Sequence, residues 1–101
     1  MALVKAANRA DIAPGQSKTI IVHGRELGVY NVAGEFYCID NMCPHAGGPI
    51  ADGQIEGEVV YCPYHMWPFN VKTGEATFNS NVCVQKYECK IEGEEVFIEI
   101  G

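Results

Sequence analysis

Two closely spaced cysteine–histidine pairs frame residues 43–65, CPHAGGPIADGQIEGEVVYCPYH. The first pair is Cys43-x-His45, and the second, after sixteen intervening residues, is Cys62-x-x-His65. Each pair offers one thiolate and one imidazole, which suits a two-iron cluster in which one iron takes both thiolates and the other takes both imidazoles. Zinc is the alternative occupant, although paired ligands of structural zinc sites usually lie about two to four residues apart, and a single residue separates Cys43 from His45. The spacing therefore favours a [2Fe-2S] cluster over zinc.

Glycines, prolines and aromatic residues surround the two pairs in a pattern that supports this interpretation. They are Gly47-Gly48-Pro49-Ile50, Asp52-Gly53, Cys62-Pro63, Trp67, Phe69 and Thr73-Gly74. With these residues, nearly the whole chain resembles the Rieske-type iron–sulfur proteins, most closely the small, soluble, low-potential Rieske ferredoxins.

The resemblance implies an all-β fold, a Rieske-like antiparallel β-sandwich with an inserted small cluster-binding subdomain. It implies one [2Fe-2S] cluster per chain, with Cys43 and Cys62 on one iron and His45 and His65 on the other. In high-potential members each ligand loop carries a second cysteine, and these two cysteines form a disulfide. The matching positions here are Gly48 and Tyr64, so that disulfide is not expected.

The same resemblance implies a one-electron carrier between a flavin reductase and a terminal oxygenase or similar enzyme. Two alternatives stay open: the small Rieske subunit of an assimilatory nitrite reductase, bound to its large subunit, and a zinc-stabilised interaction module. Catalysis by the chain itself is not expected. Rieske oxygenases need a second iron held by two histidines and a carboxylate, and only His23 remains unassigned.

Length and composition predict a single domain over residues 1–101, with the cluster-binding subdomain at about 41–71. No secretory signal is visible, because Lys5 interrupts the N-terminus before an apolar run forms. The aliphatic run at 20–22 is far too short to span a membrane. We therefore expect a cytoplasmic protein without a membrane anchor.

The formal charge of −6 is unevenly distributed along the chain. Residues 26–71 contain six acidic residues and no Lys or Arg, whereas residues 1–25 carry a net positive charge. This distribution argues against nucleic-acid binding, which requires concentrated basic charge. The acidic middle segment predicts either a partner with a basic docking face or simply a solubility feature.

Alternating apolar residues and turn signals predict strands on both sides of the cluster segment. They are expected at 3–7, 18–23, 26–32, 36–39, 58–61, 82–91 and 96–100.

The remaining cysteines and the aromatic residues after the second pair are expected to pack rather than react. Cys38 is expected on a strand face, and Cys83 and Cys89 are expected on one face of the single strand 82–91. Trp67 and Phe69 are expected to form a hydrophobic cover over the cluster.

Overall fold

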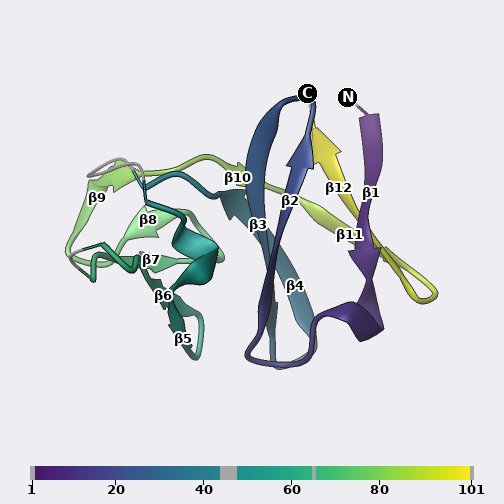
Figure 1. The fold of residues 1–101 in the computed structure, drawn as a ribbon, viewed down its shortest axis with the longest axis horizontal. Helices are drawn as coiled ribbons and strands as arrows, with labels where there is room; N and C mark the ends of the chain where they lie inside the picture. The colour runs from purple at the N-terminus through teal and green to yellow at the C-terminus, as the bar shows by residue number, and fades with distance from the viewer. Residues whose placement is uncertain (1, 44–47, 65, 101) are drawn as a thin grey trace.

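A computed structural model describes residues 2–43, 48–64 and 66–100. This part of the chain is built almost entirely from antiparallel strands, as expected for an all-β protein (Figure 1). The strands are β1 (Ala2–Asn8), β2 (Ser17–Val22), β3 (Arg25–Val32), β4 (Glu35–Asp40), β5 (Gln54–Glu56), β6 (Val59–Tyr61), β7 (Pro68–Asn70), β8 (Glu75–Ala76), β9 (Asn79–Cys83), β10 (Lys86–Tyr87), β11 (Cys89–Glu92) and β12 (Glu95–Ile100). Two short 3-10 helices join them, η1 (Arg9–Asp11) and η2 (Ile50–Asp52). No helix in the described ranges is long and apolar enough to cross a membrane.

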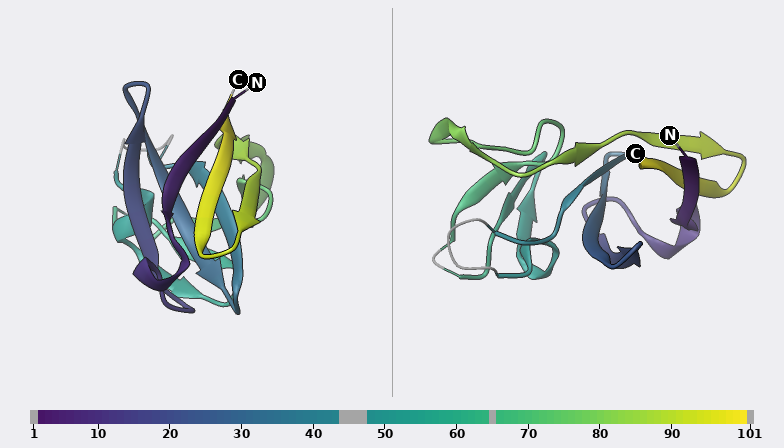
Figure 2. Two further views of the ribbon diagram at one scale, coloured as in Figure 1. Left: turned by 90° about the vertical axis from the view of Figure 1, so that its right-hand side faces the viewer. Right: turned by 90° about the horizontal axis from the view of Figure 1, so that it is seen from above.

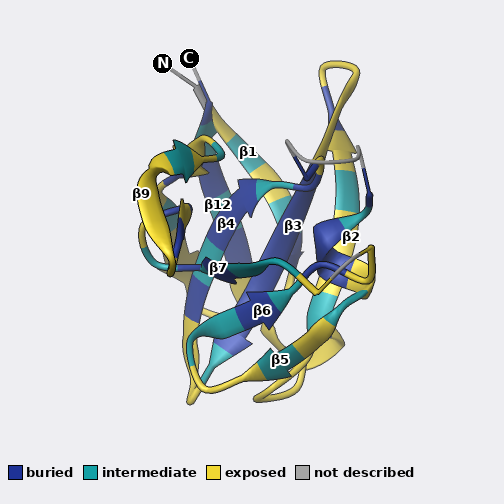
Figure 3. Cartoon of the chain, turned by 90° about the vertical axis from the view of Figure 1, so that its left-hand side faces the viewer, coloured by how far each residue is buried: buried dark blue, intermediate teal, exposed yellow. Residues whose placement is uncertain are grey.

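Two of the sheets pack face to face and form the larger part of the molecule. One sheet has the strand order β1-β12-β11, and the other has the order β10-β4-β3-β2. Strand β12 illustrates why they pack: Val96, Ile98 and Ile100 are buried, whereas the residues between them are only partly buried. Because successive side chains of a strand point to opposite faces, this alternation supplies one apolar face to the core. The side chains at the centre of the four-stranded sheet are likewise buried (Figure 3).

The third sheet is a meander of β5-β6-β7-β8-β9 beside the sandwich, seen to one side in Figure 1 and again from above in Figure 2. A second hydrophobic core lies between this sheet and strands β3 and β4 of the sandwich, and it includes the two predicted cysteine ligands. The buried members are Tyr30, Ile39, Cys43, Ile50, Ala51, Val60, Cys62, Phe69, Val71 and Ala76. This sheet continues past residue 71, the expected end of the cluster-binding part, to Cys83.

The strands expected in the first forty residues and at the C-terminus are confirmed, but the single strand predicted at 82–91 is wrong. That segment contains the end of β9, all of β10 and most of β11, and each of these strands belongs to a different sheet. Between β9 and β10 the chain passes from the small sheet to the sandwich. Val84 N–H still bonds to the Gly74 carbonyl on the small-sheet side at 2.8 Å, and the Gln85 carbonyl already accepts from Asp40 N–H on β4 at 2.9 Å. The apolar pattern of the segment does not reveal these long-range partners.

The cysteines of this segment are corrected accordingly. Cys83 and Cys89 do not share a strand, and Cys83 is exposed rather than packed. Cys89 is partly buried against the sandwich core, and Cys38 is fully buried within it, as expected.

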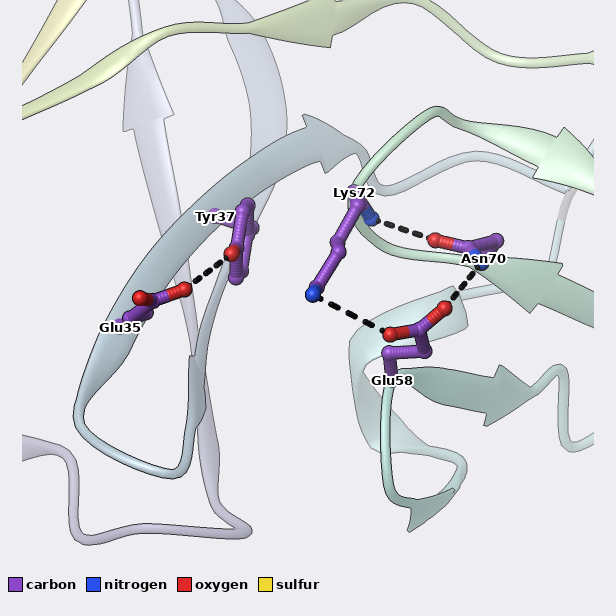
Figure 4. Close-up of polar contacts among 5 residues, drawn as sticks. All are labelled: Glu35, Tyr37, Glu58, Asn70 and Lys72. Carbon is purple, nitrogen blue, oxygen red and sulfur yellow. Dashed lines mark hydrogen bonds and ion pairs between the residues drawn. The ribbon is translucent and has the colours of Figure 1, made fainter.

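A polar bridge joins the small sheet to the sandwich (Figure 4). Lys72 Nζ lies 3.2 Å from Glu58 Oε2 and 5.6 Å from the centre of the Tyr37 ring on β4. Asn70 Nδ2 donates to the other Glu58 oxygen at 2.9 Å, and the Tyr37 hydroxyl donates to Glu35 at 2.6 Å. The cation of Lys72 therefore contacts both parts of the molecule at once.

Candidate metal centre

Cys43 and Cys62 each lie at the start of a loop that is closed by main-chain hydrogen bonds. In the first loop, Met42 pairs with Pro49, and Cys43 N–H donates to the Gly48 carbonyl at 2.9 Å. In the second, which joins β6 to β7, Cys62 N–H donates to the Trp67 carbonyl at 2.8 Å. Each cysteine is therefore the last hydrogen-bonded residue before its loop.

The two thiols are buried against each other. Cys43 is 1% exposed, Cys62 is fully buried, and the two residues are neighbours in one buried core cluster. Burial is the main cause that raises the pKa of Cys62, and the Cys43 thiol adds to it, whereas a hydrogen bond from the Tyr64 main chain acts in the opposite direction. A buried thiol pair of this kind gives up its protons when a metal binds, because the thiolate is the ligand.

Four residues of the first loop, Pro44, His45, Ala46 and Gly47, and His65 of the second lie outside the described residues. The structure thus brings together two of the four predicted ligands, Cys43 and Cys62. The assignment of His45 and His65 as the other two stays a prediction.

The positions that carry a disulfide in high-potential Rieske proteins are in contact here without one. A Cβ added to Gly48 would lie 2.8 Å from the Tyr64 ring and 3.1 Å from Cys62 Sγ. The Tyr64 side chain therefore lies over Gly48, and only glycine leaves room for both the ring and the sulfur. This cradle and the thiol pair fit a cluster iron that takes two thiolates.

The expected aromatic cover is only partly as predicted. Phe69 is fully buried in the core that contains Cys43 and Cys62, so it packs within the core and does not form a surface cover. Trp67 is partly buried, and its ring meets that of Phe78 edge to face, with 5.1 Å between centroids. Phe78, on the turn before β9, was not singled out from the sequence, although it is the one aromatic residue in the polar run at 77–81.

Tyr30 is a second residue that the sequence did not indicate. Its ring is fully buried in the core shared with the cysteines, and its hydroxyl has no hydrogen-bond partner among the described residues. Burial is the main cause that raises its pKa well above the usual range. Gly28, two residues earlier on the same face of β3, makes room for it, because an added Cβ would lie 2.8 Å from the hydroxyl oxygen.

The comparisons with known proteins agree with this geometry. The family model of the Rieske [2Fe-2S] domain matches residues 2–88. The chain is 36% identical to the ferredoxin component of the naphthalene 1,2-dioxygenase system of Pseudomonas putida, covering 97% of this chain and 95% of that protein. This chain therefore belongs to the Rieske [2Fe-2S] family.

Solved structures of a ferredoxin and of a nitrite reductase subunit both share this fold, and they differ in their sequence identity to this chain. The ferredoxin in a complex with the reduced oxygenase of carbazole 1,9a-dioxygenase has a TM-score of 0.87 and 28% identity, over 95% of this chain and 91% of that one. A protein of Mycobacterium tuberculosis, described as the small subunit of an NADH-dependent nitrite reductase, has a TM-score of 0.89 over 99% and 96%, but only 16% identity. The second likeness shows the fold alone.

Family membership identifies the cofactor as one [2Fe-2S] cluster per chain, so the zinc alternative is set aside. The chain is an electron-transfer protein of the ferredoxin type rather than an enzyme.

Proposed function

We propose that residues 1–101 act as one Rieske domain in which Cys43 and Cys62 hold one iron and His45 and His65 hold the other. The buried thiol contact between Cys43 and Cys62 is the observation that carries this ligand set, because one iron of a Rieske cluster requires two thiolates at one place. When bound, the cluster supplies one-electron redox chemistry. The surrounding residues of the chain exclude water from the two cysteine ligands, because both cysteines are buried.

We further propose that the chain is the ferredoxin component of an oxygenase system and delivers electrons from a flavin reductase to the terminal oxygenase. The support is the likeness to ferredoxin components over nearly the full length of both chains. A cytoplasmic location, where such a reductase would draw on nicotinamide cofactors, is part of the same proposal.

Exposed apolar side chains on or next to the two ligand loops suit contact with an oxygenase or a reductase. Met42 is 66% exposed, Tyr64 51%, Met66 54% and Phe78 54%. Met42 belongs to the first ligand loop, Tyr64 and Met66 belong to the second, and Phe78 contacts Trp67 of the second loop. Large apolar side chains gathered at one end of a small protein commonly mark an interaction site.

The test is reconstitution with the purified oxygenase and flavin reductase of an aromatic dioxygenase system. Reduction of the oxygenase by the reductase should depend on this chain, and the double variant Met66→Ser/Phe78→Ser should slow that step while leaving the visible spectrum of this chain intact. The variant Ile21→Ser is the matched control, because Ile21 is 72% exposed on β2, within the sandwich. Co-purification with a large haem-containing nitrite reductase subunit, without transfer to any oxygenase, would favour the nitrite reductase alternative.

A further inference from the structure

Asn41 closes the base of the first ligand loop with hydrogen bonds from both its main chain and its side chain. It follows β4 directly and is 2% exposed. Its main-chain N–H donates to the Glu26 carbonyl at 3.1 Å, and its carbonyl accepts from Ile50 N–H at 3.0 Å. Its side-chain Oδ1 accepts from Ala51 N–H at 2.6 Å, and its Nδ2 donates to Glu26 Oε1 at 3.2 Å.

The orientation of this side-chain amide follows from its partners. The main-chain N–H of Ala51 can only donate, and the carboxylate of Glu26 can only accept. The position therefore needs one acceptor and one donor on the same short side chain. Since Ala51 is itself buried, its N–H would be left without a partner if the oxygen were removed.

The pairing that begins at Asn41 continues up the loop to the ligand. After the bonds to Ile50 and Ala51 come the Met42–Pro49 bridge and the Cys43–Gly48 hydrogen bond. The pairing of residues 41–43 with residues 48–51 is therefore continuous from Asn41 to Cys43.

The base of this loop is hydrogen-bonded to the sandwich. Glu26 lies on β3, and Ser17 on β2 donates its hydroxyl proton to the Ala51 carbonyl at 2.7 Å. Cys62, in contrast, follows β6 of the small sheet. The placement of Cys43 against Cys62 thus depends on how the first loop is fixed to the sandwich.

We infer that Asn41 is the positioning residue of the first ligand loop: its carboxamide, bound to Ala51 and Glu26, fixes Cys43 against Cys62 and so controls how firmly the cluster is retained. The inference rests on the proposed ligand set. Its test uses no redox partner, so its failure would leave the electron-carrier proposal standing.

Asn31 provides a matched control. It is 4% exposed, and its side chain also makes one donor and one acceptor bond, to the Ile12 carbonyl at 2.7 Å and from Gly34 N–H at 2.8 Å. These partners lie at the turns of the sandwich. The variants Asn41→Ala and Asn31→Ala therefore each remove one donated and one accepted hydrogen bond, and only those of Asn41 lie at the ligand loop.

The measurement is the rate of cluster loss to an excess of a ferrous chelator under anaerobic conditions, followed by visible absorbance and labile sulfide. Asn41→Ala should lose its cluster about tenfold faster than Asn31→Ala, since the buried Ala51 N–H is left unpaired. Its reduced form should also show a broadened electron paramagnetic resonance spectrum, which a purely global loss of stability would not produce. Equal rates and unchanged spectra in the two variants would overturn the inference.

An exchange of donor and acceptor keeps the test decisive if Asn41→Ala does not fold. Asn41→Asp alone replaces the donor that faces the Glu26 carboxylate by an acceptor oxygen and should lose the cluster about tenfold faster. Glu26→Gln alone keeps its acceptor oxygen and should retain the cluster normally. The double variant Asn41→Asp/Glu26→Gln restores a donor–acceptor pair and should return within about twofold of the unmodified rate. If the double variant is no better than Asn41→Asp, the carboxamide contacts do not position the loop.

Discussion

At the scale of single residues, the five cysteines occupy three different environments. Cys43 and Cys62 are buried in contact with each other, Cys38 and Cys89 pack in or against the sandwich core, and Cys83 is exposed. The core to which each cysteine belongs distinguishes them: the proposed ligands are buried in the core that includes the small sheet, and the packing cysteines lie in or against the sandwich core.

The first prediction concerns the ligands. Changing any one of Cys43, His45, Cys62 or His65 to Ala should abolish the native cluster, because each iron would lose one of its two protein ligands. Iron and labile sulfide should fall from about two each per chain towards zero. Cys83→Ala is the control and should keep the unmodified visible spectrum; bleaching in this variant would contradict the ligand assignment.

The second prediction concerns thiol reactivity in the cluster-loaded protein. Burial raises the pKa of Cys89 to about 12, so at pH 8 only about one thiol in ten thousand is ionised, and the thiolate is the form that reacts. Burial also raises the pKa of Cys38, with Cys89 as the second cause. Iodoacetamide should therefore modify the exposed Cys83 first, as measured by peptide mass spectrometry over time. Modification of Cys89 as fast as Cys83 would show that the β11 environment is open to solvent.

At the scale of elements, Gly53 determines how closely η2 approaches β6. Its φ of −80° is ordinary, but a Cβ at this position would collide with the main-chain carbonyl of Tyr61, the residue before Cys62. The glycine is therefore required by a close approach of two main chains and not by a left-handed conformation.

The third prediction follows from this contact. Gly53→Ala should lower the free energy of unfolding by about 3 kcal/mol or more and speed cluster loss, because β6 and Cys62 must shift. Gly93→Ala is the control: Gly93 has a φ of +61° in the β11–β12 hairpin with open space around it, so about 1–2 kcal/mol of backbone strain is expected, without an effect on the cluster. Denaturant unfolding and the chelator assay together check both. Cluster loss at the same rate in both variants would contradict the proposed role of the contact.

The fourth prediction concerns the bridge between the two parts of the molecule. The Asn70 amide and then Lys72 hold the pKa of Glu58 below its usual range. A carboxyl group with a lower pKa in the folded state stabilises the fold above its unfolded-state pKa, and this stabilisation is lost as the pH falls through the folded-state pKa. Lys72→Met should therefore be less stable than the unmodified chain at pH 7, with the difference shrinking below about pH 4 and in high salt.

Chemical denaturation from pH 7 to pH 3 at two salt concentrations measures this difference. Lys5→Met is the matched control, because Lys5 pairs with Glu95 only at 4.0 Å and far from the bridge. A Lys72→Met difference that is as large at pH 3 as at pH 7 would mean that Lys72 acts through packing on Tyr37 instead of through Glu58.

At the scale of the whole molecule, the net charge is −6, and Asp52, Glu56 and Glu75 are exposed on the small sheet or next to it. Some of the acidic charge is locally compensated: Glu58 by Lys72, and Asp40 by a hydrogen bond from the Tyr87 hydroxyl, which itself accepts from Arg25. The sequence segment 26–71 lacks cations, but the folded chain brings two from outside that segment.

The fifth prediction tests whether the remaining acidic charge guides the partner. Electron transfer to the proposed oxygenase should slow as salt rises, because attraction between opposite charges more than about 10 Å apart is largely screened at about 0.1 M salt. Stopped-flow rates across a salt series measure this, with the double variant Asp52→Asn/Glu56→Gln expected to show a shallower slope. A flat or rising profile in the unmodified protein would assign the acidic segment to solubility.

The sequence by itself determined the family, the cofactor and the first four strands. The spacing of Cys43, His45, Cys62 and His65 indicates a two-iron cluster without any knowledge of packing, because ligand type and spacing are local properties. The hairpins of the first forty residues follow from adjacent apolar runs and their turns, which are local as well.

Only the tertiary structure decided the course of residues 82–91, the exposure of Cys83 and the role of Asn41. In each case the partner lies far along the chain: Gly74 for Val84, Asp40 for Gln85, and Glu26 for Asn41. The apolar pattern of a strand shows which of its faces is buried but not which sheet the strand joins. A polar residue before a loop, likewise, does not show which buried N–H group its side chain will bond. These choices are made when long-range main-chain groups must find partners on burial, and therefore they appear only in the folded molecule.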